Sequence, residues 1–204
     1  MRGSRINSGF PLLRRAGCLH GNDTTTTLRT FITITTLSLY NYPMRVISID
    51  PGYERMGVAI IEKTDSKEKL LFSECFKTSS KIPHEERLKL IGQEIESLIK
   101  KFEPEVMAIE TLFFKNNQKT GMQVSEARGV MLYVSAVMGL EVVEFSPMAI
   151  KIAVTGYGMS DKDQVIYMVK KLIEIDKEIK YDDEYDAIAV GLTYFATIKS
   201  GYRL

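Results

Sequence analysis

The sequence predicts an α/β domain with a mixed five-stranded sheet flanked by helices. Two observations lead to this prediction. Three runs rich in β-branched and aromatic residues follow one another over residues 46–76 with only short turns between them, as in an antiparallel meander. Beyond them, stretches with apolar residues at helical spacing alternate with short apolar runs, which is the pattern of strands connected by helices.

The first two strands are predicted to form a hairpin. A β-branched run over residues 46–49 stops at Pro51-Gly52, and a second run starts after Gly57. Asp50 therefore stands where the first strand ends. A carboxylate flanked by so much apolar sequence loses hydration, so it needs a cation, a proton or hydrogen-bond donors. The alternative is an aspartate that braces the turn before Pro-Gly.

A third strand over residues 70–76, preceded by a polar turn at 64–67, completes the meander. An amphipathic helix is then predicted over residues 83–102, and it crosses over to a strand of four apolar residues that ends at Glu110. Glu110 repeats the placement of Asp50. Two neighbouring parallel strands would bring these two carboxylates together.

The later elements are a helix over residues 123–138, a strand over 141–145 and helical stretches over 147–154 and 162–175. A last helix opens with the acidic run of residues 182–186. The helix over 123–138 has an apolar stripe, widened by Val130 and Val137, that exceeds what one sheet contact requires. It is either a fully buried helix or a helix that also forms a homodimer interface.

Four carboxylates could meet at one site. Asp183 and Asp186 are three residues apart and share one helix face, as candidates to join Asp50 and Glu110. Acids in a first helical turn also cap free amides and suit the helix dipole. That interpretation does not explain the two strand-end acids. A cluster of hard oxygen ligands suits magnesium or manganese, and two such ions can support phosphodiester hydrolysis.

Five sequence motifs resemble those of the bacterial RuvC Holliday junction resolvases, in the family's order and approximate spacing from Met44 to about Lys199. The motifs are Ile49-Asp50-Pro51-Gly52, Ala108-Ile109-Glu110-Thr111-Leu112-Phe113, Glu126-Ala127-Arg128-Gly129, the stretch from Thr155 to Val165, and Asp183-Glu184-Tyr185-Asp186-Ala187. The resemblance implies a ribonuclease-H-like fold. It also implies an endonuclease that resolves four-way DNA junctions in recombination and repair by symmetrical, metal-dependent cuts, leaving nicks that a ligase can reseal.

The resemblance also implies roles for individual residues. Asp50, Glu110, Asp183 and Asp186 match the family's catalytic, metal-binding acids, with two Mg²⁺ ions expected and Mn²⁺ as a substitute. Phe113 matches the aromatic side chain that stacks on or wedges between bases, and Lys151 and Lys162 match basic residues that contact DNA.

The same residues have simpler interpretations. A phenylalanine after a strand usually enters the core, and lysines are usually solvated surface residues. One departure from the family is that Asp161 and Asp163 flank Lys162, which weakens the positive field expected there. Arg128 either contacts DNA or pairs with an acid such as Glu126.

Residues 1–43 differ in composition from the rest of the chain. They contain five arginines, one acid and a run of four threonines, which is typical of a disordered leader, whether a transit peptide, an upstream start or an artefact of cloning. The remaining nuclease domain, residues 44–204, carries 22 basic and 25 acidic residues, a net charge of −3. DNA-binding domains are more often basic, so a local basic face has to supply the DNA contacts.

Three classes of function remain open. The first is a metal-dependent, junction-selective DNA endonuclease that acts as a homodimer, with the RuvA-RuvB branch-migration machinery as a partner that the family implies. The second is an RNA-directed nuclease of the same fold, as in the YqgF type. The third is a catalytically silent junction-binding module, which the presence of all four acids argues against.

No segment is long and apolar enough to span a bilayer, and two cysteines suit a reducing cytoplasm.

Overall fold

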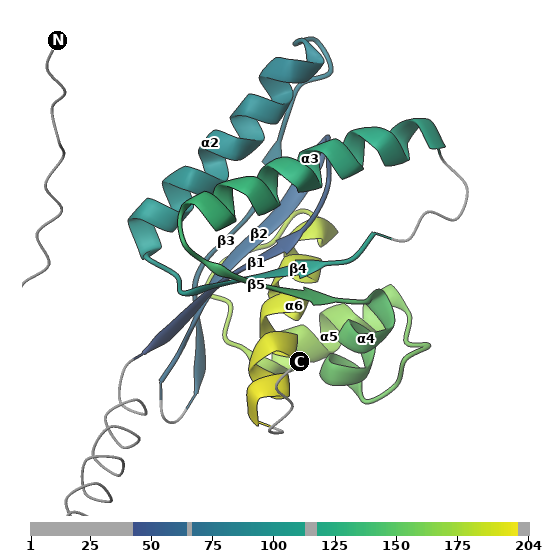
Figure 1. Ribbon diagram of the computed structural model, residues 1–204. Coiled ribbons are helices and arrows are strands. Elements are labelled where there is room, and N and C mark those ends of the chain that lie inside the picture. Colours follow the sequence, from purple (N-terminus) through teal and green to yellow (C-terminus); the bar gives the residue numbers. More distant parts are fainter. Residues whose placement is uncertain (1–42, 65–66, 113–117, 200–204) are drawn as a thin grey trace, which may run out of the picture. The chain divides into compact units, whose positions relative to one another are not determined.

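The computed structural model describes residues 43–64, 67–112 and 118–199. Its centre is a sheet of five strands in the order β3-β2-β1-β4-β5 (Figure 1). The strands are β1 (Met44–Asp50), β2 (Arg55–Lys63), β3 (Glu68–Lys77), β4 (Val106–Glu110) and β5 (Glu141–Phe145). The first three are antiparallel neighbours, whereas β4 runs parallel to both β1 and β5. The predicted mixed five-stranded sheet and its opening meander are confirmed.

Helices cover both faces of the sheet (Figure 1). One face is covered by α2 (His84–Phe102) and α3 (Gln118–Val137), which bury Ile91, Ile95 and Met131 against it. The other face is covered by α4 (Pro147–Thr155), α5 (Lys162–Leu172) and α6 (Asp182–Lys199), which pack around Val154, Val169 and Phe195. Among the described residues, no helix is long and apolar enough to cross a membrane.

Two predicted helix boundaries are wrong. α3 begins at Gln118 and not at 123, because its first residues are polar and the apolar periodicity starts only further along the helix. α5 ends at Leu172 and not at 175. Ile173 has an extended backbone, with φ −136° and ψ 142°, yet its side chain is buried in the core. The apolar spacing therefore continues past the end of the helix.

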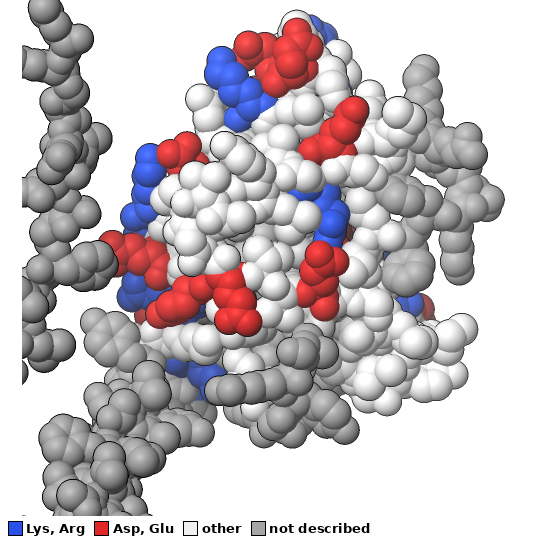
Figure 2. All heavy atoms as spheres, in the orientation of Figure 1, with Lys and Arg blue, Asp and Glu red and all other residues white. Residues whose placement is uncertain are grey.

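The wide apolar stripe of α3 divides between two neighbours. Ala127 and Met131 pack on the sheet, and Val130 lies against α2, where a Cβ added to Gly92 would be 3.0 Å from Val130 Cγ1. The outward side of α3 exposes Met122, Tyr133 and Val137 at 67%, 69% and 64% of their surface. Figure 2 views the side of α2 and α3 and shows a broad uncharged area bordered by acidic and basic groups. The stripe is therefore wider than the core requires, as predicted.

The predicted leader lies outside the described residues except for Pro43. Phe113, predicted to meet DNA bases, also lies outside them.

Candidate active site

Asp50 and Glu110 end two adjacent parallel strands on the same face of the sheet. The register pairs Ile49 with Ile109, so the next residue of each strand is one of the two acids. Side chains alternate along a strand, and Val46 and Ala108 lie in the core on the α6 side. Asp50 and Glu110, an even number of residues further along, therefore point to the same side as α6. This arrangement agrees with the prediction from sequence.

α6 brings two more carboxylates to this edge because its backbone lies unusually close to the sheet. A Cβ on Gly57 would be 1.9 Å from the carbonyl oxygen of Asp183, so only glycine allows this approach. Gly57 is the register partner of Asp50. Further along α6, a Cβ on Gly191 would lie 2.7 Å from Ile61 Cδ1. Glycines on the sheet and on the helix thus seat α6 directly on the strands.

The carboxyl groups are close enough to perturb one another. Burial raises the pKa of Asp50 well above its usual range, and the nearby carboxylates of Glu110, Asp186 and Asp183 raise it further. Burial and the charge of Asp186 raise the pKa of Glu110 to about 7. Burial likewise raises the pKa of Asp186, although Lys162 opposes the rise. The four predicted acids therefore form one electrostatic cluster.

Two cations lie among these acids. Lys162 Nζ is 2.9 Å from Asp186 Oδ2 and 2.6 Å from Asp182 Oδ2, and these contacts raise the pKa of its ammonium group despite partial burial. Arg55 Nε lies 3.5 Å from Asp183 Oδ2. A surface pocket lined by Glu110, Asp186, Lys151 and Lys162 opens at this point, with Ile150 and Val165 among its apolar lining residues. The structure thus brings both predicted lysines to the carboxylate cluster.

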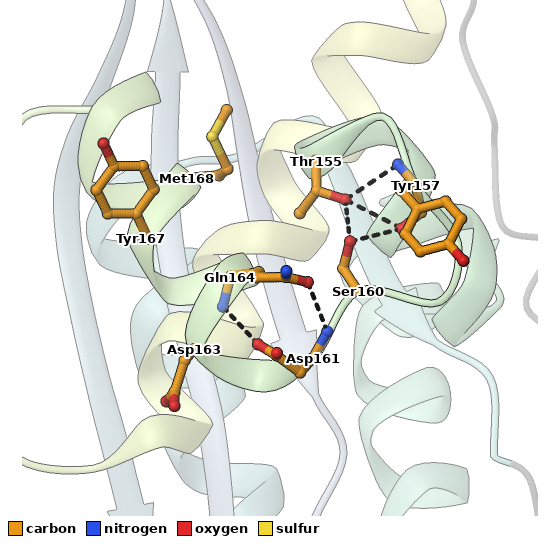
Figure 3. A pocket seen from close by; sticks show the side chains of 8 residues that line it. All are labelled: Thr155, Tyr157, Ser160, Asp161, Asp163, Gln164, Tyr167 and Met168. Carbon is orange, nitrogen blue, oxygen red and sulfur yellow. Dashed lines mark hydrogen bonds between the residues drawn. The ribbon is translucent and has the colours of Figure 1, made fainter.

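Lys162 owes its position to the start of α5. Asp161 is the N-cap of that helix: its Oδ1 accepts a hydrogen bond from Gln164 N at 2.8 Å, and its own N–H donates to Gln164 Oε1 at 3.0 Å (Figure 3). The preceding loop is tied by a hydrogen bond of 2.7 Å between the hydroxyls of Thr155 and Ser160 (Figure 3). The carboxylate of Asp161 is therefore used for capping, and the acids that meet Lys162 come from α6 instead.

The donor set fits hard divalent cations. Four carboxylates supply only oxygen ligands, which suit magnesium and manganese. Burial, together with the charges of neighbouring carboxylates, raises the pKa values of Asp50, Glu110 and Asp186, so a bound cation would stabilise their ionised forms. Within the described part of the chain, however, no three Asp, Glu, His or Cys side chains are already arranged around one point as metal ligands. Lys162 and Arg55 occupy part of the space beside Asp186 and Asp183.

Some residues of the site were not predicted from sequence. Arg55 and Asp182 both form ion pairs here, but an arginine after a turn and the first acid of an acidic run are too common to single out. Arg128, for which two interpretations were open, pairs with Glu144 at 2.7 Å. Its neighbour Glu126 pairs with His84 instead, also at 2.7 Å.

Known proteins of one family are similar to this chain. The family model described as crossover junction endodeoxyribonuclease RuvC matches residues 46–194. The chain is 42% identical over 148 residues to the protein of that name from Thermosipho melanesiensis, which covers 72% of this chain and 94% of the relative. It is 38% identical over 157 residues to the protein of that name from Fusobacterium nucleatum, covering 77% and 83% of the two chains.

Solved structures give the same result. The structure of Thermus thermophilus RuvC in complex with Holliday junction substrate is similar with a TM-score of 0.73 and 30% identity, covering 78% of this chain and 96% of that one. The yeast mitochondrial Holliday junction resolvase Ydc2 has a TM-score of 0.60 at 16% identity over 86% and 88% of the two chains, which shows a shared fold alone.

Proposed function

This chain belongs to the RuvC family of crossover junction endodeoxyribonucleases, and we propose that it resolves four-way DNA junctions with the carboxylate cluster at the ends of β1 and β4. The observation that carries this proposal is the convergence of Asp50 and Glu110 with Asp183 and Asp186. The proposed products are paired, symmetrical nicks that a ligase can reseal.

The four acids are the proposed ligands of divalent metal ions, with two Mg²⁺ ions per site and Mn²⁺ as a substitute. When bound, such ions would supply the chemistry that activates a water molecule and stabilises the departing oxygen of a phosphodiester. Asp50 and Glu110 hold one side of the site from the rigid strand ends. Asp183 and Asp186 would hold the other side from the first two turns of α6.

The lysines have a separate role in the proposal. Lys151 and Lys162 line the same pocket as Glu110 and Asp186, so a DNA phosphate that enters the site would lie beside two ammonium groups. Such contacts bring the backbone into register with the catalytic acids without reading its sequence. Phe113, three residues beyond Glu110, is proposed to stack on a base near the crossover, because aromatic side chains contribute to nucleic-acid binding by stacking.

A homodimer is the proposed working form. The exposed apolar side of α3, with Met122, Tyr133 and Val137, offers a surface that a second copy could cover. A twofold dimer would present one site to each of the two equivalent strands of a junction. The partnership with RuvA-RuvB and a cytoplasmic location stay predictions that rest on the family resemblance.

The proposal is tested by incubating the purified protein with a synthetic four-way DNA junction, with and without Mg²⁺, and mapping the cuts. We expect paired symmetrical nicks that appear only with the metal and that a DNA ligase reseals. A structured RNA of similar size is the comparison substrate. Preferential cleavage of the RNA, or junction binding with no nicking at any metal concentration, would contradict the proposal.

A further inference from the structure

Glu184 lies between two of the proposed metal ligands in the sequence, yet its side chain is directed elsewhere. It is only 5% exposed, and its Oε1 accepts a hydrogen bond of 2.6 Å from Ser73 Oγ on β3. The same carboxylate oxygen forms an ion pair with Lys177. Lys177 Nζ also donates a hydrogen bond of 2.5 Å to the carbonyl oxygen of Ser73. Ser73, Lys177 and Glu184 therefore contact one another and connect β3, the α5–α6 connection and α6.

Helical geometry explains why Glu184 points away from the acid cluster. Successive residues of a helix are rotated by about 100°, so Asp183 and Asp186 lie within about 60° of each other. Glu184 is rotated by about 100° from Asp183 and faces β3. One helical turn therefore presents two acids to the site and a third to the sheet.

The contact holds the first turn of α6 at a second point. The backbone of that turn already rests on β2, where Gly57 allows the carbonyl group of Asp183 to approach. On the next strand, β3, Asp183 Oδ2 accepts a hydrogen bond of 3.8 Å from Cys75 Sγ. Glu184 adds a shorter side-chain hydrogen bond to Ser73 of the same strand. Together these contacts restrict both the height of the helix start above the sheet and its rotation about the helix axis.

We infer that Glu184, held by Ser73 and Lys177, is a positioning residue that sets the location of Asp183 and Asp186 relative to Asp50 and Glu110. This inference rests on the proposed function of the four acids. Glu184 is buried but the Lys177 side chain is 46% exposed, so the ion pair adds little net stability, and a role in fixing one arrangement is a better account of its presence. Small displacements matter, because a misplacement of about 1 Å at a catalytic site can reduce the rate about 100-fold.

The test compares Glu184→Ala and Glu184→Gln with the unchanged protein in two measurements. The first is the concentration of Mn²⁺ that gives half of the maximal metal-induced rise in melting temperature, measured without DNA. The second is the cleavage rate and the dissociation constant for a synthetic four-way junction. We expect Glu184→Ala to raise the half-saturating Mn²⁺ concentration at least about 5-fold and to lower the rate about 10- to 100-fold, with junction affinity changed less than about 2-fold. Glu184→Gln still accepts the hydrogen bond from Ser73, so its half-saturating Mn²⁺ concentration and its cleavage rate should change less than those of Glu184→Ala.

Glu62→Ala is the matched control. It breaks an ion pair of 2.8 Å with Arg45 at the other end of β1 and β2, away from the acids. This variant should lose stability but keep the Mn²⁺ dependence and the cleavage rate. Equal behaviour of Glu184→Ala and Glu62→Ala in both measurements would overturn the inference.

Two further outcomes are covered by the same design. If Glu184→Ala does not fold, Glu184→Gln and Ser73→Ala replace it, and an unchanged Mn²⁺ dependence in both overturns the inference. If the unchanged protein binds Mn²⁺ but does not cut junctions, the proposed function fails. The metal-binding measurement then still decides whether Glu184 positions the acids.

Discussion

Replacing Glu110 with Gln should make the metal-free protein more stable while removing its activity. The pKa of Glu110 is raised from an ordinary value of 4.5 to about 7. Between these two values the folded protein holds a proton that the unfolded chain has released, so the free energy of unfolding falls as the pH rises through this range. Above pH 7 the ionised carboxylate destabilises the folded state. A neutral amide of the same shape removes that effect.

The magnitude follows from the size of the shift. One pKa unit corresponds to about 1.4 kcal/mol, so a shift of this size corresponds to at most about 3 kcal/mol at pH 8 and to less than about 1 kcal/mol at pH 5. Glu110 is partly exposed, and solvent screening reduces the upper bound. We expect Glu110→Gln to raise the free energy of unfolding by about 1–2 kcal/mol at pH 8 and by much less at pH 5.

Urea denaturation with EDTA, followed by circular dichroism at pH 5 and pH 8, measures this difference. Glu96→Gln is the control, since it removes a surface ion pair of 2.6 Å with Lys100 on α2 and should change stability by less than about 0.5 kcal/mol at either pH. A Glu110→Gln variant no more stable than the unchanged protein at pH 8, or equally stabilised at both pH values, would refute the reasoning.

Four further predictions concern activity and assembly. Asp50→Asn should reduce junction cleavage at least about 10⁴-fold while a gel-shift assay still shows junction binding. A variant that fails to fold would contradict this prediction and assign Asp50 a structural role. Lys151→Met should weaken junction binding and lower the slope of log affinity against log salt by about one, and an unchanged slope would remove Lys151 from the DNA surface. Phe113→Ala should slow cleavage with little change in melting temperature, and full activity would contradict its wedge role. Tyr133→Glu should convert a dimer into a monomer in analytical ultracentrifugation, whereas a dimer that persists would place the interface elsewhere.

The strands and the strand-end acids were predictable from local sequence. Short turns at Pro51-Gly52 and after Lys63 join the β-branched runs. Because short connections usually join neighbouring antiparallel strands, they predict the pairing of β1 with β2 and of β2 with β3. The parallel pairing of β1 with β4 follows from the intervening helix. The order of strands and helices along the chain is therefore sufficient to place Asp50 and Glu110 side by side.

The ion pairs of the site could not be predicted in the same way. Lys162 and Asp186 are 24 positions apart, and their contact depends on how α5 packs beside α6. The acidic run of residues 182–186 likewise contains acids with three different neighbours: Asp182 meets Lys162, Asp183 meets Arg55, and Glu184 meets Ser73. Which acid faces which neighbour is decided by the rotation of α6, and composition carries no information about it.

The close seating of α6 on the sheet, which Gly57 of β2 and Gly191 of α6 itself allow, has a consequence for how the ion preference of the proposed metal site could change. Two of the proposed ligands are carried by the strands and two by the helix, so the distance between α6 and the strand ends would set the spacing of the proposed metal ligands. Divalent ions differ in radius and in tolerance of irregular coordination, so this spacing would discriminate among them. Substituting residues between α6 and the sheet would therefore change this ion preference without replacing any of the proposed ligands.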